Sequence, residues 1–461
     1  MAKSKTTERD EQHQMSRRAL IKWSLAAGAA LGVSRSKIFD ILEKTGGKGL
    51  AYAASENPTA RSVSLVAGNG GLAWFQLMWP YPDIARARNG QFAWHKPGME
   101  MTVAGTDRDL VIGPDTPWAN LPPSRQVTAF VCGNTETHTN QPQTVTNLNG
   151  SNIFSVASAL QSATSSVIPL VTIGDVDVGT APGGARPANV GDGEGIVGLF
   201  NSAASRAGGL LASTTNASLY KAHYDSATQL NRAANRSTTL SSYTTAKGAA
   251  KFLGTNLATK LAITPDDLTR YGVDGNTRSN VADIAKALIV SVKSFKMALT
   301  NSVVIPAMRD DPHGAFNGDV NVVPGQLKKV FDAFMADLTN TTDDNTMKSL
   351  ADDTIITICG DTPKDPTQRV NWPDGPPGNT NIVYVYSAGN LNTGWFGSID
   401  RNSTVKGFDE KGLPAAYNGT NTAKLATASI AYAIAKRDDR AISAFANGIT
   451  ISGVFGRVKD T

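Results

Sequence analysis

Short apolar runs recur along the chain and predict buried β-strands. Each run is rich in Val, Ile and Thr, and most are apolar on both faces rather than alternating. Strands buried on both faces are typical of a parallel sheet that is covered by helices on either side. The runs span residues 62–67, 126–132, 167–173, 302–308, 354–359 and 382–387.

Helical patterns lie between several of these runs. Residues 326–338 place apolar side chains at helical spacing on one face, and residues 153–162 and 422–436 are also predicted to be helical. Strands that alternate with helices predict an α/β protein. We therefore expect a three-layer α/β/α domain with a mostly parallel central sheet.

Two segments interrupt the alternation. Residues 179–195 are rich in Gly and Pro and predict a long surface loop. Residues 200–300 are rich in Ala, Ser, Thr and Asn with weak helical periodicity, which predicts a helical insertion or, alternatively, a partly mobile segment. We expect a single domain over residues 54–461 that carries this insertion.

The N-terminal region has the features of an export signal. Arg17 and Arg18 precede an apolar run at residues 23–33, which is shorter than the roughly 20 residues needed to span a bilayer. Ala51 and Ala53 flank Tyr52 in the small-x-small pattern that a signal peptidase cleaves. The paired arginines resemble the twin-arginine translocation signal.

This resemblance implies that residues 1–53 form a signal peptide and that the working protein begins near Ala54. The implied partner is the twin-arginine translocase, with transient membrane contact through the signal peptide. The implied location is periplasmic, extracellular or in the cell envelope. The alternative is an amphipathic N-terminal helix that stays attached, and an uncleaved signal would tether the protein to the membrane.

The charge of the chain changes once the signal is set aside. The whole chain carries 44 basic and 39 acidic residues, but residues 1–54 alone hold ten basic and five acidic ones. The remaining 34 basic and 34 acidic residues balance. A neutral protein lacks the positive surface that nucleic-acid binding requires, so we expect no nucleic-acid partner.

Cys132 and Cys359 are the only cysteines, and each lies near the end of a predicted strand. Two cysteines in an exported protein can pair in a disulfide. Twin-arginine substrates generally fold before export in a reducing compartment, which favours two buried thiols instead.

Four predicted strands are followed directly by polar or ionisable residues. In an open α/β sheet, functional sites are built at the carboxyl ends of the strands. The loop at residues 68–74 is glycine-rich but has neither a carboxylate nor the Lys-Ser/Thr pair of a phosphate-binding loop. It is therefore a poor catalytic loop.

The other three loops carry candidate chemistry. Thr137 and His138, after the second strand, are a candidate nucleophile and a candidate ligand or acid, the alternative being a hydrogen-bonded loop. Asp311 and His313 are suitable ligands for one divalent metal, the alternative being a polar turn. Asp361 follows a later strand, where an aspartate is often a turn or cap residue.

Six tryptophans are scattered through Gly/Pro-rich loops. They can stack on sugars, or they can pack beneath the loops, which is the commoner role. The tryptophans therefore leave undecided whether the protein binds a small-molecule or glycan ligand. These tryptophans are Trp74, Trp79, Trp94, Trp118, Trp372 and Trp395.

Taken in order, the loops resemble a large family of twin-arginine-exported bacterial proteins called domain of unknown function 1501. The family's first strand ends in Gly-Gly-x-Asp-Gly and a later Pro-Tyr, which match residues 70–74 and 80–81 here. Its Ser-His corresponds to Thr137 and His138. Its Asp-Thr-His-Gly corresponds to residues 311–314.

The resemblance continues to the C-terminus and covers residues 61–456. The family's Gly-Arg-Thr-Pro and Arg-Asp-His-Trp correspond to residues 360–363 and 369–372, and its following strand and glycine-rich turn correspond to residues 382–397. The family is placed in the alkaline phosphatase and sulfatase superfamily. The resemblance therefore implies that superfamily's α/β/α fold.

The resemblance also implies a site. Members of the superfamily hold one or two divalent metals that activate a nucleophile for cleavage of phosphate or sulfate esters. Carried over, Thr137 and His138 are the expected catalytic residues, and Asp311, His313 and Asp361 are the expected metal ligands. The expected metal is zinc, manganese or calcium.

This chain departs from the family at several ligands. Ala73 replaces the first-strand Asp, and Val370 and Asn371 replace the late Asp-His pair. A shift of the alignment by two or three residues recovers Asp374 or Asp361 in their place. Each lost anionic ligand weakens the attraction for a metal ion.

These departures leave two main hypotheses. The first is an exported cell-envelope protein with a degenerate metal site and a binding or structural role. The second is an active metal-dependent hydrolase centred on Asp311, His313 and His138. Convergence of these three residues with another carboxylate would favour the hydrolase, whereas Ala73 and Val370 lining that point would not.

Overall fold

A computed structural model describes most of the chain after the N-terminal region. The described residues are 59–87, 89–93, 99–164, 166–200 and 256–458, with isolated positions between 201 and 255. The predicted export residues Arg17, Arg18, Ala51 and Ala53 lie outside these ranges.

The chain divides into two compact units. The larger unit holds residues 50–164, 168–194 and 263–461, and the smaller holds residues 1–49, 165–167 and 195–262. In the smaller unit the described helices are most of α6 (Gly193–Phe200) and α9 (Leu257–Leu261). The single domain over residues 54–461 and the insertion at 200–300 stay predictions.

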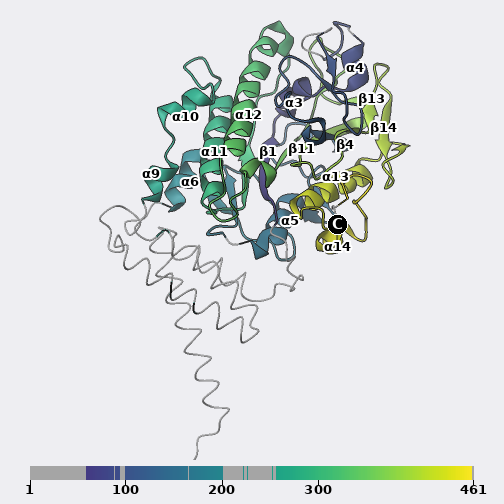
Figure 1. The fold of residues 1–461 in the computed structure, drawn as a ribbon. Coiled ribbons are helices and arrows are strands. Elements are labelled where there is room, and N and C mark those ends of the chain that lie inside the picture. The colour runs from purple at the N-terminus through teal and green to yellow at the C-terminus, as the bar shows by residue number, and fades with distance from the viewer. Residues whose placement is uncertain are drawn as a thin grey trace, which may run out of the picture. The chain divides into compact units, whose positions relative to one another are not determined.

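An eight-stranded sheet is the centre of the larger unit (Figure 1). Neighbouring strands are parallel except around β11, which is antiparallel to both of its neighbours, β10 and β4. In spatial order the strands are β12 (Gly394–Phe396), β4 (Thr128–Asn134), β11 (Thr380–Tyr386), β10 (Thr354–Gly360), β1 (Arg61–Ala67), β9 (Ser302–Pro306), β7 (Leu170–Ile173) and β8 (Ala188–Val190). All six strands predicted from the sequence are present.

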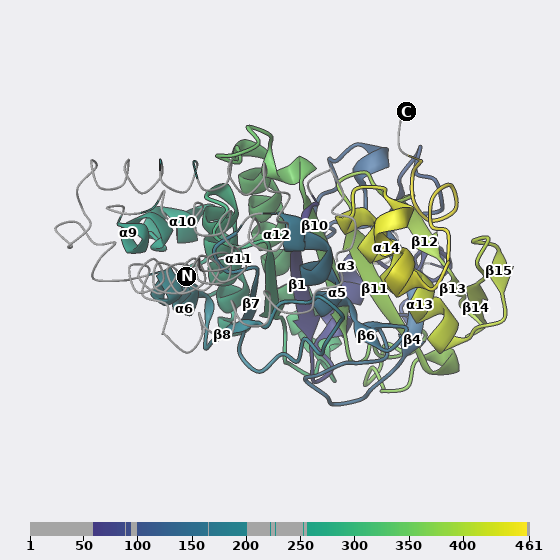
Figure 2. The ribbon, with the colours of Figure 1, turned by 90° about the horizontal axis from the view of Figure 1, so that it is seen from below.

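Helices cover both faces of this sheet, which confirms the α/β class and is consistent with three layers (Figures 1 and 2). One face carries α5 (Ile153–Leu160), α13 (Gly419–Ile434) and α14 (Asp439–Ala446). The other carries α3 (Leu72–Met78), α11 (Ser279–Lys296) and α12 (Val323–Asn340). Helices α5, α12 and α13 are the three predicted from the sequence.

Smaller elements decorate the loops. The short helices are α4 (Pro82–Arg86) and α10 (Pro265–Arg270). The short strands are β2 (Met101–Thr102), β3 (Val111–Ile112), β5 (Asn147–Leu148), β6 (Ser151–Asn152), β13 (Ser398–Ile399), β14 (Val405–Phe408) and β15 (Pro414–Ala415).

Side chains alternate between the two faces of the sheet, and both faces are buried. In β11, Val383 and Val385 join the apolar cluster under α5 and α13. Tyr384 and Tyr386 point to the other face, where Tyr384 packs 5.2 Å from Trp79 between ring centroids. Burial on both faces explains why the strands read as continuous apolar runs in the sequence.

The helix boundaries follow from capping residues. The Asn418 side chain accepts a hydrogen bond of 3.0 Å from the Asn421 amide and so begins α13. The Asn152 side chain accepts one of 2.9 Å from the Phe154 amide and begins α5. Such caps satisfy amides that lack a partner within the helix.

Both cysteines are buried free thiols, as the reducing compartment of folding favoured, and they do not form a disulfide with each other. Burial raises the pKa of Cys359 to about 12 and the pKa of Cys132 further. A thiol held protonated in this way is a poor nucleophile or ligand.

The tryptophans pack beneath the loops rather than offering a surface. Those within the described ranges are all at most 5% exposed, and Trp94 lies outside the ranges. They therefore provide no stacking platform for a sugar.

Across the described helices, none is both long enough and apolar enough to cross a bilayer.

Candidate metal centre

The loops that follow β1, β4, β9 and β10 meet at the carboxyl edge of the parallel strands. Because β11 runs antiparallel, the segment that leads into it arrives at this same edge, and Thr380 at its start pairs with Asn134 at the end of β4. Polar residues from four loops therefore converge at one place, as open α/β sheets generally arrange.

His138 stands at the centre of this convergence. Its Nδ1 atom lies 3.2 Å from Asn69 Oδ1 and 3.6 Å from Asp311 Oδ2. Its Nε2 atom lies 3.3 Å from Asp374 Oδ2. The backbone of His138 has a φ of 61°, a left-handed conformation that is uncommon outside glycine and often found at functional sites.

His313 is held in one tautomer. Its Nδ1 atom lies 2.8 Å from the carbonyl oxygen of Asn371, so Nδ1 carries the proton and donates it. The lone pair is then on Nε2, which lies 3.4 Å from Asp311 Oδ2. A backbone carbonyl that fixes the ring in this way is the usual outer partner of a metal-binding histidine.

Together these residues form a group that can hold a metal ion. One ligand atom from each of His138, Asp311 and His313 lies within 4.8 Å of the other two. Zinc bonds of about 2.0–2.2 Å place tetrahedral ligand atoms roughly 3.3–3.6 Å apart, close to the 3.4 and 3.6 Å separations from Asp311. The donor set and its spacing therefore fit a divalent ion.

Asp374 adds a second carboxylate that the residue-by-residue alignment missed. Its Oδ2 atom lies 3.3 Å from His138 Nε2 and 3.7 Å from His313 Nε2. If His138 binds the metal through Nδ1, Asp374 orients the imidazole ring through Nε2. If His138 binds the metal through Nε2, Asp374 lies close enough to be a fourth ligand. A shift of the late motif by a few residues was the sequence feature that pointed to it.

Burial and hydrogen bonding act in opposite directions on Asp374. Burial raises the pKa of its carboxyl. The hydrogen bond and charge of Lys364, with the charges of His313 and His138, lower this pKa by a larger amount. The net pKa is below the ordinary value. Asp374 is therefore ionised, as a ligand to a cation must be.

Lys364 is the residue that sequence analysis did not identify at all. Its side chain is 0% exposed, and Nζ pairs with Asp374 Oδ1 and lies 2.6 Å from Asp311 Oδ1. The Asp311 contact is an ion pair whose angles fall outside hydrogen-bond geometry. Nζ also lies 3.2 Å from His313 Nε2.

Asp361, predicted as a metal ligand, has a different role. It is fully buried, and its two oxygens accept hydrogen bonds of 3.1 and 3.0 Å from the Gly70 amide. A further bond of 2.7 Å comes from the Thr362 amide. Asp361 thus fastens the loop after β1, because its position at the end of a buried strand turns it inward, and burial raises its pKa to about 6.

Thr137, the expected nucleophile, is exposed in the turn beside His138. Within the described part of the chain, no hydrogen bond joins its hydroxyl to a base. Of the residues at the expected family ligand positions, Ala73 is buried in α3 and Val370 is 79% exposed, whereas Asn371 contacts the cluster through its carbonyl oxygen.

Close backbone packing makes the loop after β1 dependent on glycine. A Cβ atom on Gly71 would lie 1.3 Å from the Met308 carbonyl oxygen. One on Gly70, which has a φ of 82°, would lie 2.8 Å from Asp311 Oδ1. These glycines therefore allow this loop to pack against the segment that carries Asp311.

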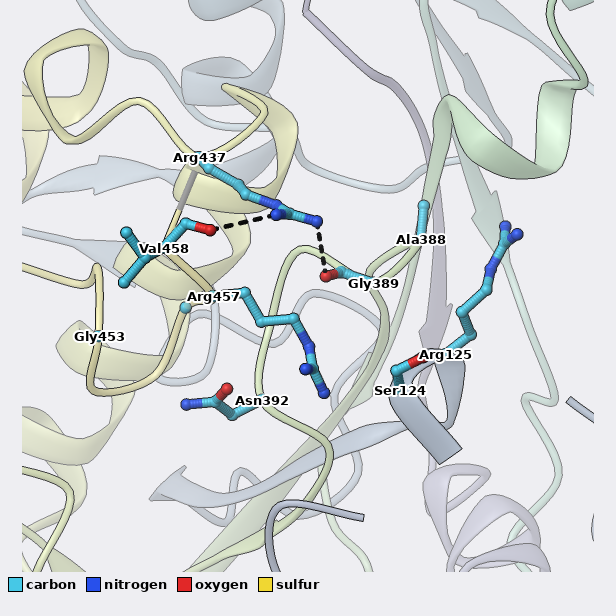
Figure 3. A pocket seen from close by; sticks show the side chains of 10 residues that line it. Ser124, Arg125, Ala388, Gly389, Asn392, Arg437, Gly453, Arg457 and Val458 are labelled. Atoms are coloured by element: carbon cyan, nitrogen blue, oxygen red, sulfur yellow. Dashed lines mark hydrogen bonds between the residues drawn. The ribbon is translucent and has the colours of Figure 1, made fainter. Parts of the chain in front are cut away.

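A polar cavity of about 600 Å³ lies where β11 ends and β4 begins, at the edge of the sheet opposite the cluster. Figure 3 shows the side chains that line it. Arg125, Arg437 and Arg457 line it, but each guanidinium is bound to the protein. Arg437 donates to the carbonyls of Gly389 and Val458, both at 3.2 Å.

The other two arginines of this cavity pair with carboxylates. Arg457 pairs with Asp107 and donates to the Leu391 carbonyl at 3.2 Å. Arg125 lies 2.7 Å from Asp352. We interpret these arginines as structural, because their contacts hold the C-terminal segment against the loop after β11.

Comparison with known proteins adds no relative. No family model, curated protein or solved structure matches this chain.

Proposed function

We propose that this protein is a metal-dependent hydrolase of phosphate or sulfate esters that works at the His138, Asp311 and His313 cluster. The observation that carries the proposal is the convergence of these three ligands with a second carboxylate, Asp374, from three separate loops. Three protein ligands with an open side are typical of catalytic rather than structural metal sites.

The donor set narrows the choice of metal. Two imidazoles and one or two carboxylates suit zinc or manganese, whereas calcium prefers six to eight oxygen ligands. We therefore propose zinc or manganese. A bound divalent ion supplies Lewis-acid polarisation of an ester oxygen and a lowered pKa for water.

The chain's own residues hold and orient this chemistry. The Asn371 carbonyl keeps the His313 lone pair on Nε2, directed at the carboxylates. The side chains of His138 and His313 are 47% and 44% exposed, so the cluster opens to solvent and to a substrate. Thr137, exposed beside His138, stays the proposed side-chain nucleophile.

A second candidate function is a binding or structural role with a degenerate metal site. The observation that favours it is the Lys364 ammonium, which already neutralises part of the cluster. Two unit charges 4 Å apart interact by about 4 kcal/mol at an effective dielectric constant of 20. A divalent ion at such a distance from Lys364 would be repelled about twice as strongly.

The predicted export is part of both proposals. Arg17 and Arg18 support recognition by the twin-arginine translocase, and Ala51 and Ala53 support cleavage. The proposed location is the periplasm or cell envelope. The balanced charge after residue 54 supports the absence of a nucleic-acid partner.

The test is metal content and ester hydrolysis of the purified protein. We expect zinc or manganese by elemental analysis after incubation with either metal, and turnover of p-nitrophenyl phosphate or p-nitrophenyl sulfate. Asp311→Asn should lower both, the turnover by at least about 100-fold, because it removes an anionic ligand.

Glu410→Gln, at an exposed carboxylate, is the matched control and should leave both unchanged. Metal binding without turnover in either assay would favour the binding role. A protein that binds neither metal would overturn the metal site altogether.

A further inference from the structure

Lys364 occupies an unusual position for a lysine. The side chain is fully buried, and its ammonium contacts Asp311, Asp374 and His313, three of the groups that would surround a metal ion. The Lys364 backbone has a φ of 60°, which a residue with a side chain seldom adopts. The fold therefore accepts local strain where this ammonium enters the cluster.

The contact with His313 is the decisive one. The Nδ1 proton of His313 is donated to the Asn371 carbonyl, so Nε2 holds the ring's one available lone pair. Lys364 Nζ lies 3.2 Å from that atom and donates to it. A single lone pair cannot accept this hydrogen bond and bind a metal ion at the same time.

We propose that the Lys364 ammonium is an internal cation that competes with a divalent metal ion for His313 and for the two carboxylates. This inference depends on the proposed metal site. In the metal-free protein, Lys364 holds the cluster together, and binding of a metal ion requires Nζ to leave His313 Nε2. The site therefore binds metal more weakly than its ligands alone would allow.

Two effects of Lys364 on metal affinity oppose each other. Lys364 orients Asp311 and Asp374 through their Oδ1 atoms, and loss of such an outer contact typically weakens metal binding by roughly 10–100-fold. Lys364 also repels a divalent ion and blocks His313 Nε2. The charge repulsion at a buried position is the larger effect, so removal of the ammonium should tighten binding.

The experiment compares Lys364→Met with the wild-type protein. Methionine keeps an unbranched apolar stem but has no charge. We expect Zn²⁺ and Mn²⁺, titrated alone in a calorimeter, to bind Lys364→Met at least about 10-fold more tightly. Lys406→Met, at an exposed lysine, is the matched control and should equal the wild type.

The outcomes separate this inference from the proposed function. Equal or weaker binding by Lys364→Met, with measurable binding by the wild type, would overturn the competition but leave the metal site. Absence of binding in both proteins would overturn the metal site and the competition together.

A crystal structure of the wild-type protein with Zn²⁺ gives a test that needs no variant to fold. The expected result is Zn²⁺ on His313 Nε2 with Lys364 Nζ moved out of hydrogen-bond reach. Zn²⁺ bound while Nζ keeps its present contact with Nε2 would contradict the inference.

Discussion

The two edges of the central sheet both concentrate charge, but they use it differently. At the carboxyl edge, His138, Asp311 and His313 direct ligand atoms at one another across 3.4–3.6 Å. At the opposite edge, Arg437 and Arg457 direct their guanidinium groups at backbone carbonyls and a carboxylate. One edge leaves lone pairs facing a common point, and the other uses its donors to fasten the chain.

This comparison shows why a charged cavity is not by itself a site. The arginine-lined cavity has a volume of about 600 Å³ and carries three positive charges. Its charged groups nevertheless serve contacts within the protein. The carboxyl edge is the better candidate because ligand atoms of His138, Asp311 and His313 gather within 4.8 Å of one another and both histidine side chains are partly exposed.

The largest effect is expected from breaking the packing of the carboxyl edge. Gly71→Ala would place Cβ 1.3 Å from the Met308 carbonyl oxygen and force the backbone apart. We expect the free energy of unfolding to fall by more than about 3 kcal/mol, measured by urea denaturation. Metal affinity should fall as well, because the displaced segment leads to Asp311.

Gly90→Ala is the control for this change, since no atom lies within 4 Å of its added Cβ. It should have the stability of the wild type. Stability of Gly71→Ala equal to that of Gly90→Ala would contradict the close approach of the two loops.

A change of similar size is expected in the pH dependence of stability. The pKa of Asp361 is raised by burial to about 6, above its ordinary value of 3.8. The folded chain therefore binds this proton more tightly than the unfolded chain, and its stabilising effect is lost as the pH rises from about 4 to about 6. The loss is up to roughly 3 kcal/mol for a shift of about two units.

Asp361→Asn removes this titration, and its stability should stay flat over that range relative to the wild type. Urea unfolding at pH 4.0, 5.0 and 6.5 measures the difference. Parallel curves for the two proteins would show that Asp361 does not titrate in this window.

The smallest effect is expected at the opposite edge. Arg457→Met loses the hydrogen bond to the Leu391 carbonyl and the ion pair with Asp107. Asp107 keeps hydrogen bonds of 2.8 and 3.1 Å from Thr393, so we expect a loss of only about 1–2 kcal/mol. Calorimetric titration should show unchanged metal affinity, and an altered affinity would mean that the two edges are coupled.

The sequence predicted the sheet well because strands that are buried on both faces are continuous apolar runs in the sequence. All six apolar runs became strands, and the three periodic stretches became α5, α12 and α13. The short strands β8 and β12 were missed because three residues are too few for a pattern.

The site was predicted less completely, since side-chain direction depends on loop conformation. His138, Asp311 and His313 were found because they directly follow strands that end at one edge. Lys364 enters the cluster through a left-handed backbone, and the sequence does not show that geometry. Asp361 was assigned to the metal although its carboxylate turns inward to backbone amides.

The antiparallel direction of β11 has a consequence for the order in which the molecule is made. Asn371 and Asp374 lie in the loop that leaves β10 at the carboxyl edge, and β11 closes this loop by entering the sheet at the same edge and pairing with β4 and β10. A nascent chain that ends before residue 386 lacks the end of β11, whose pairing closes the loop that carries Asp374 and the Asn371 carbonyl. The cluster is therefore completed late in synthesis, so metal would load onto an almost finished chain.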